Sequence, residues 1–69
     1  MDKNESAFLG YVAEKIARYY GLELSTARKI VAKSGLPELY EKNPAMVLHD
    51  CIERWAEDVY TAYAIGGGE

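Results

Sequence analysis

The sequence lacks the residues from which disulfide-bonded and cysteine-zinc domains are built. Its one cysteine, Cys51, excludes an intramolecular disulfide and any zinc site made of several cysteines. The sequence also has no signal-like N-terminus and no apolar run of membrane length, so we expect a cytoplasmic protein that does not contact a membrane. Basic residues are in the minority, with 8 Lys and Arg against 11 Asp and Glu and a net charge of −3. That balance argues against strong non-specific binding of nucleic acid by the whole chain.

The chain is long enough for one small domain. It has 69 residues, of which 49% are hydrophobic, so a core can form although it is limited in size. A domain of this length has marginal stability unless it packs well or associates with another chain. We predict a single helical domain over residues 1–65 and a flexible glycine-rich tail over residues 66–69, where three consecutive glycines cannot sustain a helix.

The first half of the chain predicts two helices joined by a glycine turn. Apolar residues recur at helical spacing over residues 5–20, and Asp2 followed by Glu5 has the form of a capping box, with Asn4 as the alternative N-cap. Gly21 can take the left-handed conformation that ends a helix. A second helix is expected over residues 26–34 with Ser25 as its N-cap. A small residue, a tight turn and buried contacts in this order are typical of a helix-turn-helix.

The second half predicts a short helical turn and one long helix. Pro37 is suited to open a turn that runs to Lys42, which Leu39 or Tyr40 would anchor to the core. An N-cap asparagine and a proline at the first helical position, Asn43 and Pro44, then start a helix over residues 44–64. The predicted fold class is therefore all-α, a compact three-helix domain with a helix-turn-helix-like first half and a short helical turn before a long C-terminal helix. The predicted core consists of Phe8, Val12, Ile16, Leu22, Ile30, Val31, Leu36, Leu48, Ile52, Trp55 and Val59.

Charge is distributed unevenly along the chain. Residues 15–33 carry five basic side chains and only one acidic side chain, whereas residues 34–69 carry seven acidic and two basic side chains. The basic face of the second helix could contact DNA phosphates or bases, or it could be an ordinary solvated surface. The candidate DNA-binding residues are Ser25, Thr26, Arg28, Lys29 and Lys33.

Six tyrosines are too many for so small a core, so we expect some of them on the surface, where tyrosine favours protein interfaces. The acidic face of the C-terminal helix offers a docking surface for a basic partner, or for the basic second helix of another copy of this chain. Alternatively it is simply solvated. The candidate protein-interface residues are Tyr11, Tyr19, Tyr40, Asp50, Glu53, Glu57, Tyr60 and Tyr63.

No constellation in the sequence indicates catalysis. His49 and Cys51 lie two positions apart, which on a helix separates them by about 200° and prevents a nucleophile–base pair. His49 and Glu53 could hold a metal ion only with ligands from elsewhere. There is no phosphate-binding loop and no hydroxyl–histidine–acid set. We therefore predict a protein that is not an enzyme and that has no cofactor, no metal and no catalytic residues.

The chain carries four short segments in order, which are Tyr20-Gly21-Leu22 with Ser25 and Ala27, Ser34-Gly35-Leu36, Leu39-Tyr40-Glu41 and Val47-Leu48-His49. Their layout resembles that of a small bacterial family of all-helical domains of unknown function. The resemblance covers residues 8 to 63, and the sequence differs from the family at residues 43–46, where the family has a more open "N-Y-D-V" type of entry. Genes of such proteins often lie beside genes of ADP-ribosyltransferase-like toxins, so the resemblance implies an antitoxin-like or accessory binding role and supplies no catalytic residues.

The sequence thus leaves two functional hypotheses. The first is a non-enzymatic protein-interaction module, antitoxin-like or an accessory regulator of a partner protein. The alternative is a helix-turn-helix transcriptional regulator that binds DNA through its second helix, and it would be a dimer because one short helix rarely supplies enough affinity. Association of two copies is expected to be compatible with both hypotheses.

Overall fold

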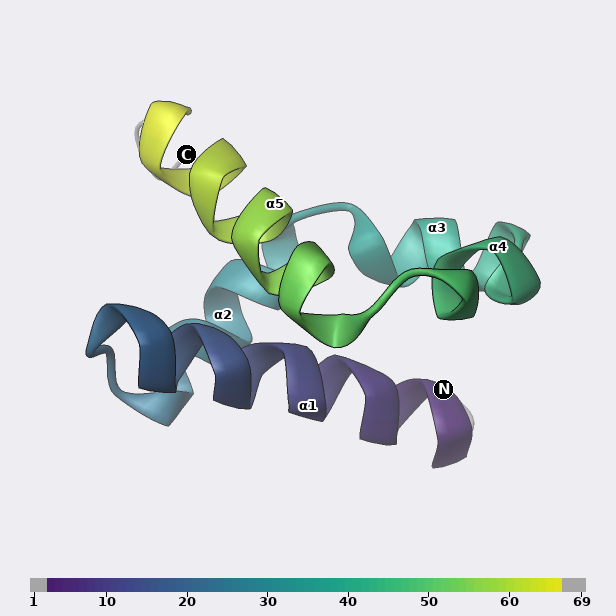
Figure 1. Ribbon diagram of the computed structural model, residues 1–69, viewed down its shortest axis with the longest axis horizontal. Helices are drawn as coiled ribbons and strands as arrows, with labels where there is room; N and C mark the ends of the chain where they lie inside the picture. The colour runs from purple at the N-terminus through teal and green to yellow at the C-terminus, as the bar shows by residue number, and fades with distance from the viewer. Residues whose placement is uncertain (1–2, 67–69) are drawn as a thin grey trace.

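The computed structural model describes residues 3–66 and forms an all-α globule of five helices (Figure 1). Helix α1 packs against both α2 and α5, and α3 and α4 lie together at the N-terminal end of α1. The principal extents are 28 × 20 × 20 Å. The helices span α1 Lys3–Tyr20, α2 Leu24–Lys33, α3 Leu36–Lys42, α4 Pro44–His49 and α5 Ile52–Ile65.

Helix α1 supplies the centre of the core. Its side chains at helical spacing form one stripe, in which Val12, Ala13 and Ile16 have no exposed surface. Glu5, in the first turn, is also buried, and the expected capping partner Asp2 lies outside the described residues. The stripe packs against buried side chains of the other helices, which are Ala27, Ile30 and Val31 of α2, Leu36 and Tyr40 of α3, Val47 of α4, and Ala56 and Val59 of α5.

A glycine with positive φ follows the end of each of the first two helices, and the sequence predicts this role for Gly21. Gly21 has φ 67°, and behind it the N–H of Leu22 donates to the carbonyl of Ala17 at 3.0 Å. Gly35 has φ 88° and follows Ser34, the C-cap of α2. The Oγ of Ser34 donates to the Val31 carbonyl at 2.6 Å and accepts from the N–H of Leu36 at 3.2 Å, so this one hydroxyl connects α2 to α3.

The predicted N-cap of the second helix is wrong. Helix α2 begins at Leu24, and Glu23 is its N-cap without a side-chain capping bond. The Glu23 carbonyl already accepts the first helical hydrogen bond, from the N–H of Ala27 at 3.0 Å, because the turn at Gly21 is shorter than expected. Ser25 therefore lies inside the first turn. The turn predicted from Pro37 to Lys42 is a complete helix, α3, with the proline in its first turn.

The prediction of one continuous helix over residues 44–64 is also wrong. The chain separates into α4 and α5 at Asp50 and Cys51, whose backbones are extended. A continuous helix would place Leu48 beside Ile52 in the core, but Leu48 is 54% exposed and its neighbour Val47 is fully buried instead. The predicted start of α4 is confirmed, since the Oδ1 of Asn43 accepts from the N–H of Met46 at 3.3 Å.

Two side-chain contacts hold α3 and α4 onto the long helices. The Nε1 of Trp55 in α5 donates to the carbonyl of Val47 in α4 at 2.8 Å. The Tyr40 ring in α3 lies 5.5 Å, centroid to centroid, from the ring of Phe8 in α1. Tyr40 is only 5% exposed, so it anchors α3 to the core as expected, and its prediction as an interface residue is wrong.

We predict that Trp55→Phe destabilises the protein and loosens α4. The substitution removes the donor and leaves a carbonyl in the core without that partner, which costs about 1–3 kcal/mol. The free energy of unfolding, measured with denaturant by circular dichroism, should fall by this amount, and the Val47 amide should exchange its hydrogen faster. The control Tyr11→Phe, at an exposed position, should change the stability by less than about 0.5 kcal/mol. Unchanged exchange in α4 would contradict this role of Trp55.

Gly10, in the interior of α1, is a position where a substitution should raise the stability of the protein. A Cβ added there meets no heavy atom within 4 Å, so alanine fits without a clash. We expect Gly10→Ala to stabilise the protein by about 0.5–1 kcal/mol, because glycine is the poorer helix former. The matched change Gly21→Ala should destabilise it, since alanine is strained at positive φ. Thermal unfolding of the two variants would show the predicted divergence, and a fall in stability with Gly10→Ala would contradict the prediction.

Candidate protein-interaction surface

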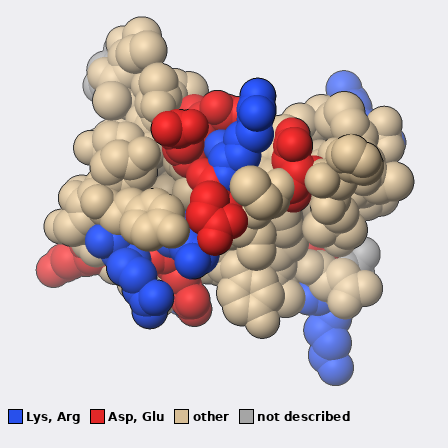
Figure 2. Space-filling view, in the orientation of Figure 1, with Lys and Arg blue, Asp and Glu red and all other residues tan. Residues whose placement is uncertain are grey.

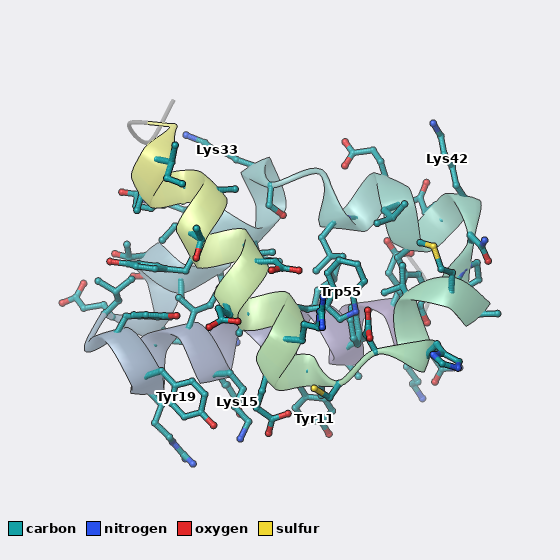
Figure 3. The ribbon with its side chains drawn as sticks, turned by 45° about the horizontal axis from the view of Figure 1, so that its top comes forward. Tyr11, Lys15, Tyr19, Lys33, Lys42 and Trp55 are labelled. Atoms are coloured by element: carbon teal, nitrogen blue, oxygen red, sulfur yellow. The ribbon has the colours of Figure 1, made fainter. Side chains whose placement is uncertain are left out.

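One side of α1 presents an exposed row of long side chains. Tyr11, Lys15 and Tyr19 are spaced four residues apart and therefore lie on one stripe (Figure 3). The two tyrosines are 53% and 56% exposed. Between them, the Nζ of Lys15 lies 5.5 Å from the centroid of the Tyr19 ring and 3.4 Å from a carboxylate oxygen of Glu53 in α5. Lys15 thus connects the tyrosine row to the acidic helix.

A second set of contacts continues this surface toward the C-terminal ends of both helices. The rings of Tyr20 in α1 and Tyr60 in α5 are stacked, with centroids 3.8 Å apart and planes 9° from parallel. The ring of Tyr63 follows at 6.1 Å from Tyr60. Because Lys15 faces Glu53 and Tyr20 faces Tyr60, α1 and α5 run in the same general direction here. We call the region the α1/α5 surface, and it comprises Tyr11, Lys15, Tyr19, Tyr20, Glu53, Glu57 and Tyr60.

Apart from Tyr40 and Asp50, the predicted interface residues lie on these two helices, with Tyr11 and Tyr19 on α1 and Glu53, Glu57, Tyr60 and Tyr63 on α5. Tyr60 is half-buried by its stack, and Tyr63 remains 41% exposed one turn further along α5. Glu57 is exposed one turn after Glu53, and Asp50 is exposed just before α5 begins. Figure 2 shows acidic side chains gathered over α5, with a basic side chain among them and further basic side chains just below. Tyr40 alone among the predicted interface residues lies in the core.

Sequence reasoning missed the residue that connects these groups. Lys15 was grouped with the basic residues of the central segment, although it lies on α1 and faces α5. Its spacing of four residues from both Tyr11 and Tyr19 was a usable signal, since such residues share a helix face. The pairing of Tyr20 with Tyr60 had no local signal, because the two residues are forty positions apart and meet only through the packing of α1 on α5.

Glu53 has an electrostatic environment that favours its charged form. The pKa of its carboxyl group lies below the ordinary value of 4.5. The largest cause is a hydrogen bond from the backbone of Glu53 itself, in the first turn of α5, followed by the hydrogen bond and the positive charge of Lys15. The side chain is exposed, so this pair fixes the geometry of the surface more than it stabilises the fold.

The candidate DNA-binding residues all lie on α2 but do not form one face. Ser25, Arg28, Lys29 and Lys33 are exposed, and Thr26 is half-buried. Thr26, Lys29 and Lys33 line a groove of about 370 Å³ between α2 and α5. Arg28 instead lines a separate hollow with residues of α1 and α3. The positive charges of α2 are therefore divided between two depressions.

The remaining polar candidates do not converge. His49 and Cys51 are exposed at the junction of α4 and α5. Within residues 3–66 no group of three His, Cys, Asp or Glu side chains is placed to hold a metal ion. No helix in this described part of the chain is both long enough and apolar enough to cross a membrane.

Comparison with known proteins does not add an assignment. No family model matches the chain, and no curated protein and no solved structure matches it significantly. The interpretation of these surfaces therefore depends on the geometry of the chain itself.

The ion pair between Lys15 and Glu53 gives a prediction about pH. Lys15→Gln should raise the pKa of Glu53 only part of the way to 4.5, because the backbone hydrogen bond remains. The pKa is lowered by folding, so the stability that this carboxylate contributes is complete above its unfolded pKa and is lost as the pH falls through the folded pKa. An NMR titration of the Glu53 carboxyl carbon measures the change. Lys29→Gln, a matched change in α2, should leave that titration unaltered, and an equal response to both variants would contradict the assignment.

Proposed function

We propose that this protein is a non-enzymatic module that binds a partner protein through the α1/α5 surface. The observation that supports the proposal is the exposed tyrosine row on α1 beside the paired charge of Lys15 and Glu53. Large aromatic side chains that are exposed on a small domain, with a few charges between them, are the usual composition of a binding hot spot.

The contacts within this surface favour binding by reducing its entropic cost. A tyrosine has few rotatable bonds, and Tyr20, Tyr60 and Tyr19 are already held by stacking or by the ammonium group of Lys15. A partner that covers these rings immobilises little additional side-chain freedom. The acidic groups at Asp50 and Glu57 lie at the margin, where charges select a partner of opposite sign and accelerate its approach.

A partner encoded by a neighbouring toxin gene would agree with the family resemblance of the sequence, and the module would then act as an antitoxin-like or accessory regulator. A helix-turn-helix regulator that reads DNA through α2 is the alternative, supported by the exposed cations of that helix. Against it, Lys29 and Lys33 border a groove whose other wall is α5, so they do not project alone from the protein.

The proposal is tested by placing a photoreactive benzoylphenylalanine at Tyr11 or at Tyr19 in cells of the source organism and identifying what it cross-links. The identified protein is then purified and titrated against the variants. Tyr11→Ser/Tyr19→Ser should weaken its binding about tenfold or more, since hot-spot tyrosines typically contribute at least ~1 kcal/mol each. The control Glu38→Ser/Lys42→Ser, two exposed positions on α3, should leave it unchanged.

Two results would contradict this proposal. One is binding of the purified partner that the two tyrosine substitutions do not weaken. The other is salt-sensitive binding of a labelled DNA duplex, measured by fluorescence anisotropy, that Arg28→Glu/Lys29→Glu/Lys33→Glu abolishes. The second result would establish the DNA-binding alternative in place of the protein-binding function.

A further inference from the structure

The groove between α2 and α5 combines an apolar floor with a cationic rim. Its floor is formed by Ile30 and Val59, which are 5% and 6% exposed, together with Ala62. The rim on the α2 side carries Lys29 and Lys33, and Lys33 lies near the C-terminal end of α5 (Figure 3). The groove is distinct from the α1/α5 surface, because it lies against α2 and not against α1.

The two lysines are the charge that this groove offers to a ligand. They are spaced four residues apart, so their side chains leave α2 on the same stripe. In the described part of the chain, no carboxylate lies within 4.0 Å of either ammonium group. The hydroxyl of Ser34, which also lines the groove, is already engaged with the backbone of α2 and α3. An incoming group therefore meets two cations above an apolar floor.

The size of the groove limits what can fill it. Its volume of about 370 Å³ is near the lower end of the ~300–1,000 Å³ typical of ligand pockets, so it takes a few side chains. Tyr63 on its wall is 41% exposed, which extends the apolar area beyond the floor. A phosphate backbone would pair with the lysines and leave this apolar area in contact with water.

We propose that the groove binds an acidic amphipathic helix of a partner protein. Apolar side chains on one face of that helix cover Ile30, Val59 and Ala62, and carboxylates four residues apart pair with Lys29 and Lys33. One such helix covers the apolar floor and pairs with both lysines at the same time. This inference rests on the proposed function, because it assumes a protein partner, and it assigns to that partner a second contact with its own chemistry.

The test uses a short fluorescein-labelled peptide with leucines on one helical face and glutamates on the other. Its fluorescence anisotropy is titrated with the full chain and with variants whose folding is verified by circular dichroism. Lys29→Glu/Lys33→Glu should weaken peptide binding about tenfold or more, since two attractive pairs become repulsive. The control Lys3→Glu/Lys42→Glu has the same net charge as this variant but changes two exposed lysines outside the groove. It should bind the peptide within about twofold of the unchanged chain. Ala62→Phe, which fills the groove without altering charge, should also weaken binding.

Three outcomes would overturn the inference: no binding of the acidic peptide, equal loss with both pairs of lysine variants, or undiminished binding of a peptide in which serines replace the leucines. A DNA duplex that binds through Lys29 and Lys33 while the peptide does not would overturn it in favour of DNA. The variant Tyr11→Ser/Tyr19→Ser should bind the peptide normally. A peptide that binds at the groove while no partner depends on the tyrosines would remove the α1/α5 surface as the primary site and leave the groove in place.

Discussion

The burial of one helix between two others determines most of this structure. Helix α1 must remove the stripe containing Val12, Ala13 and Ile16 from water, and within residues 3–66 the longest helices that can cover it are α2 and α5. Packing on two sides leaves a flank of α1 exposed beside α5, which is where Tyr11 and Tyr19 lie. The same arrangement brings α5 beside α2 as well as α1. Both candidate surfaces are therefore consequences of how α1 is covered.

The sequence predicted local structure well where a single residue determines it. Gly21 and Gly35 end helices because they can adopt positive φ, and Asn43 starts one because its side chain accepts a backbone hydrogen bond. Seven of the predicted core residues are buried, and three others, Leu22, Ile52 and Trp55, are half-buried. The failure at Leu48 has a tertiary cause. Helical spacing alone favours Leu48, but the extended backbone at Asp50 and Cys51 separates α4 from α5, and Val47 is the residue that is buried.

The sequence predicts which kinds of residue form the candidate site, but it predicts much less about how they are arranged in space. Exposed tyrosines and an acidic last helix were both evident in the sequence, but the distribution of the tyrosines between core and surface was not. Tyr40 is buried because α3 packs into the core and brings its ring to Phe8 of α1, a contact between residues that are far apart in the sequence. Likewise the five polar residues of α2 suggest one reading face, whereas the packing of neighbouring helices places Arg28 in a different depression from Lys29 and Lys33.

Helix α5 contributes a wall to both the α1/α5 surface and the α2/α5 groove, with Tyr60 on the first side and Ala62 on the second. A ligand that orders the last turns of this helix from one side lowers the entropic cost of binding on the other side. Such coupling is reciprocal, so each ligand would raise the affinity of the other by the same factor. Under the proposed function, the domain would therefore hold a partner that engages both surfaces more tightly than it holds two separate partners.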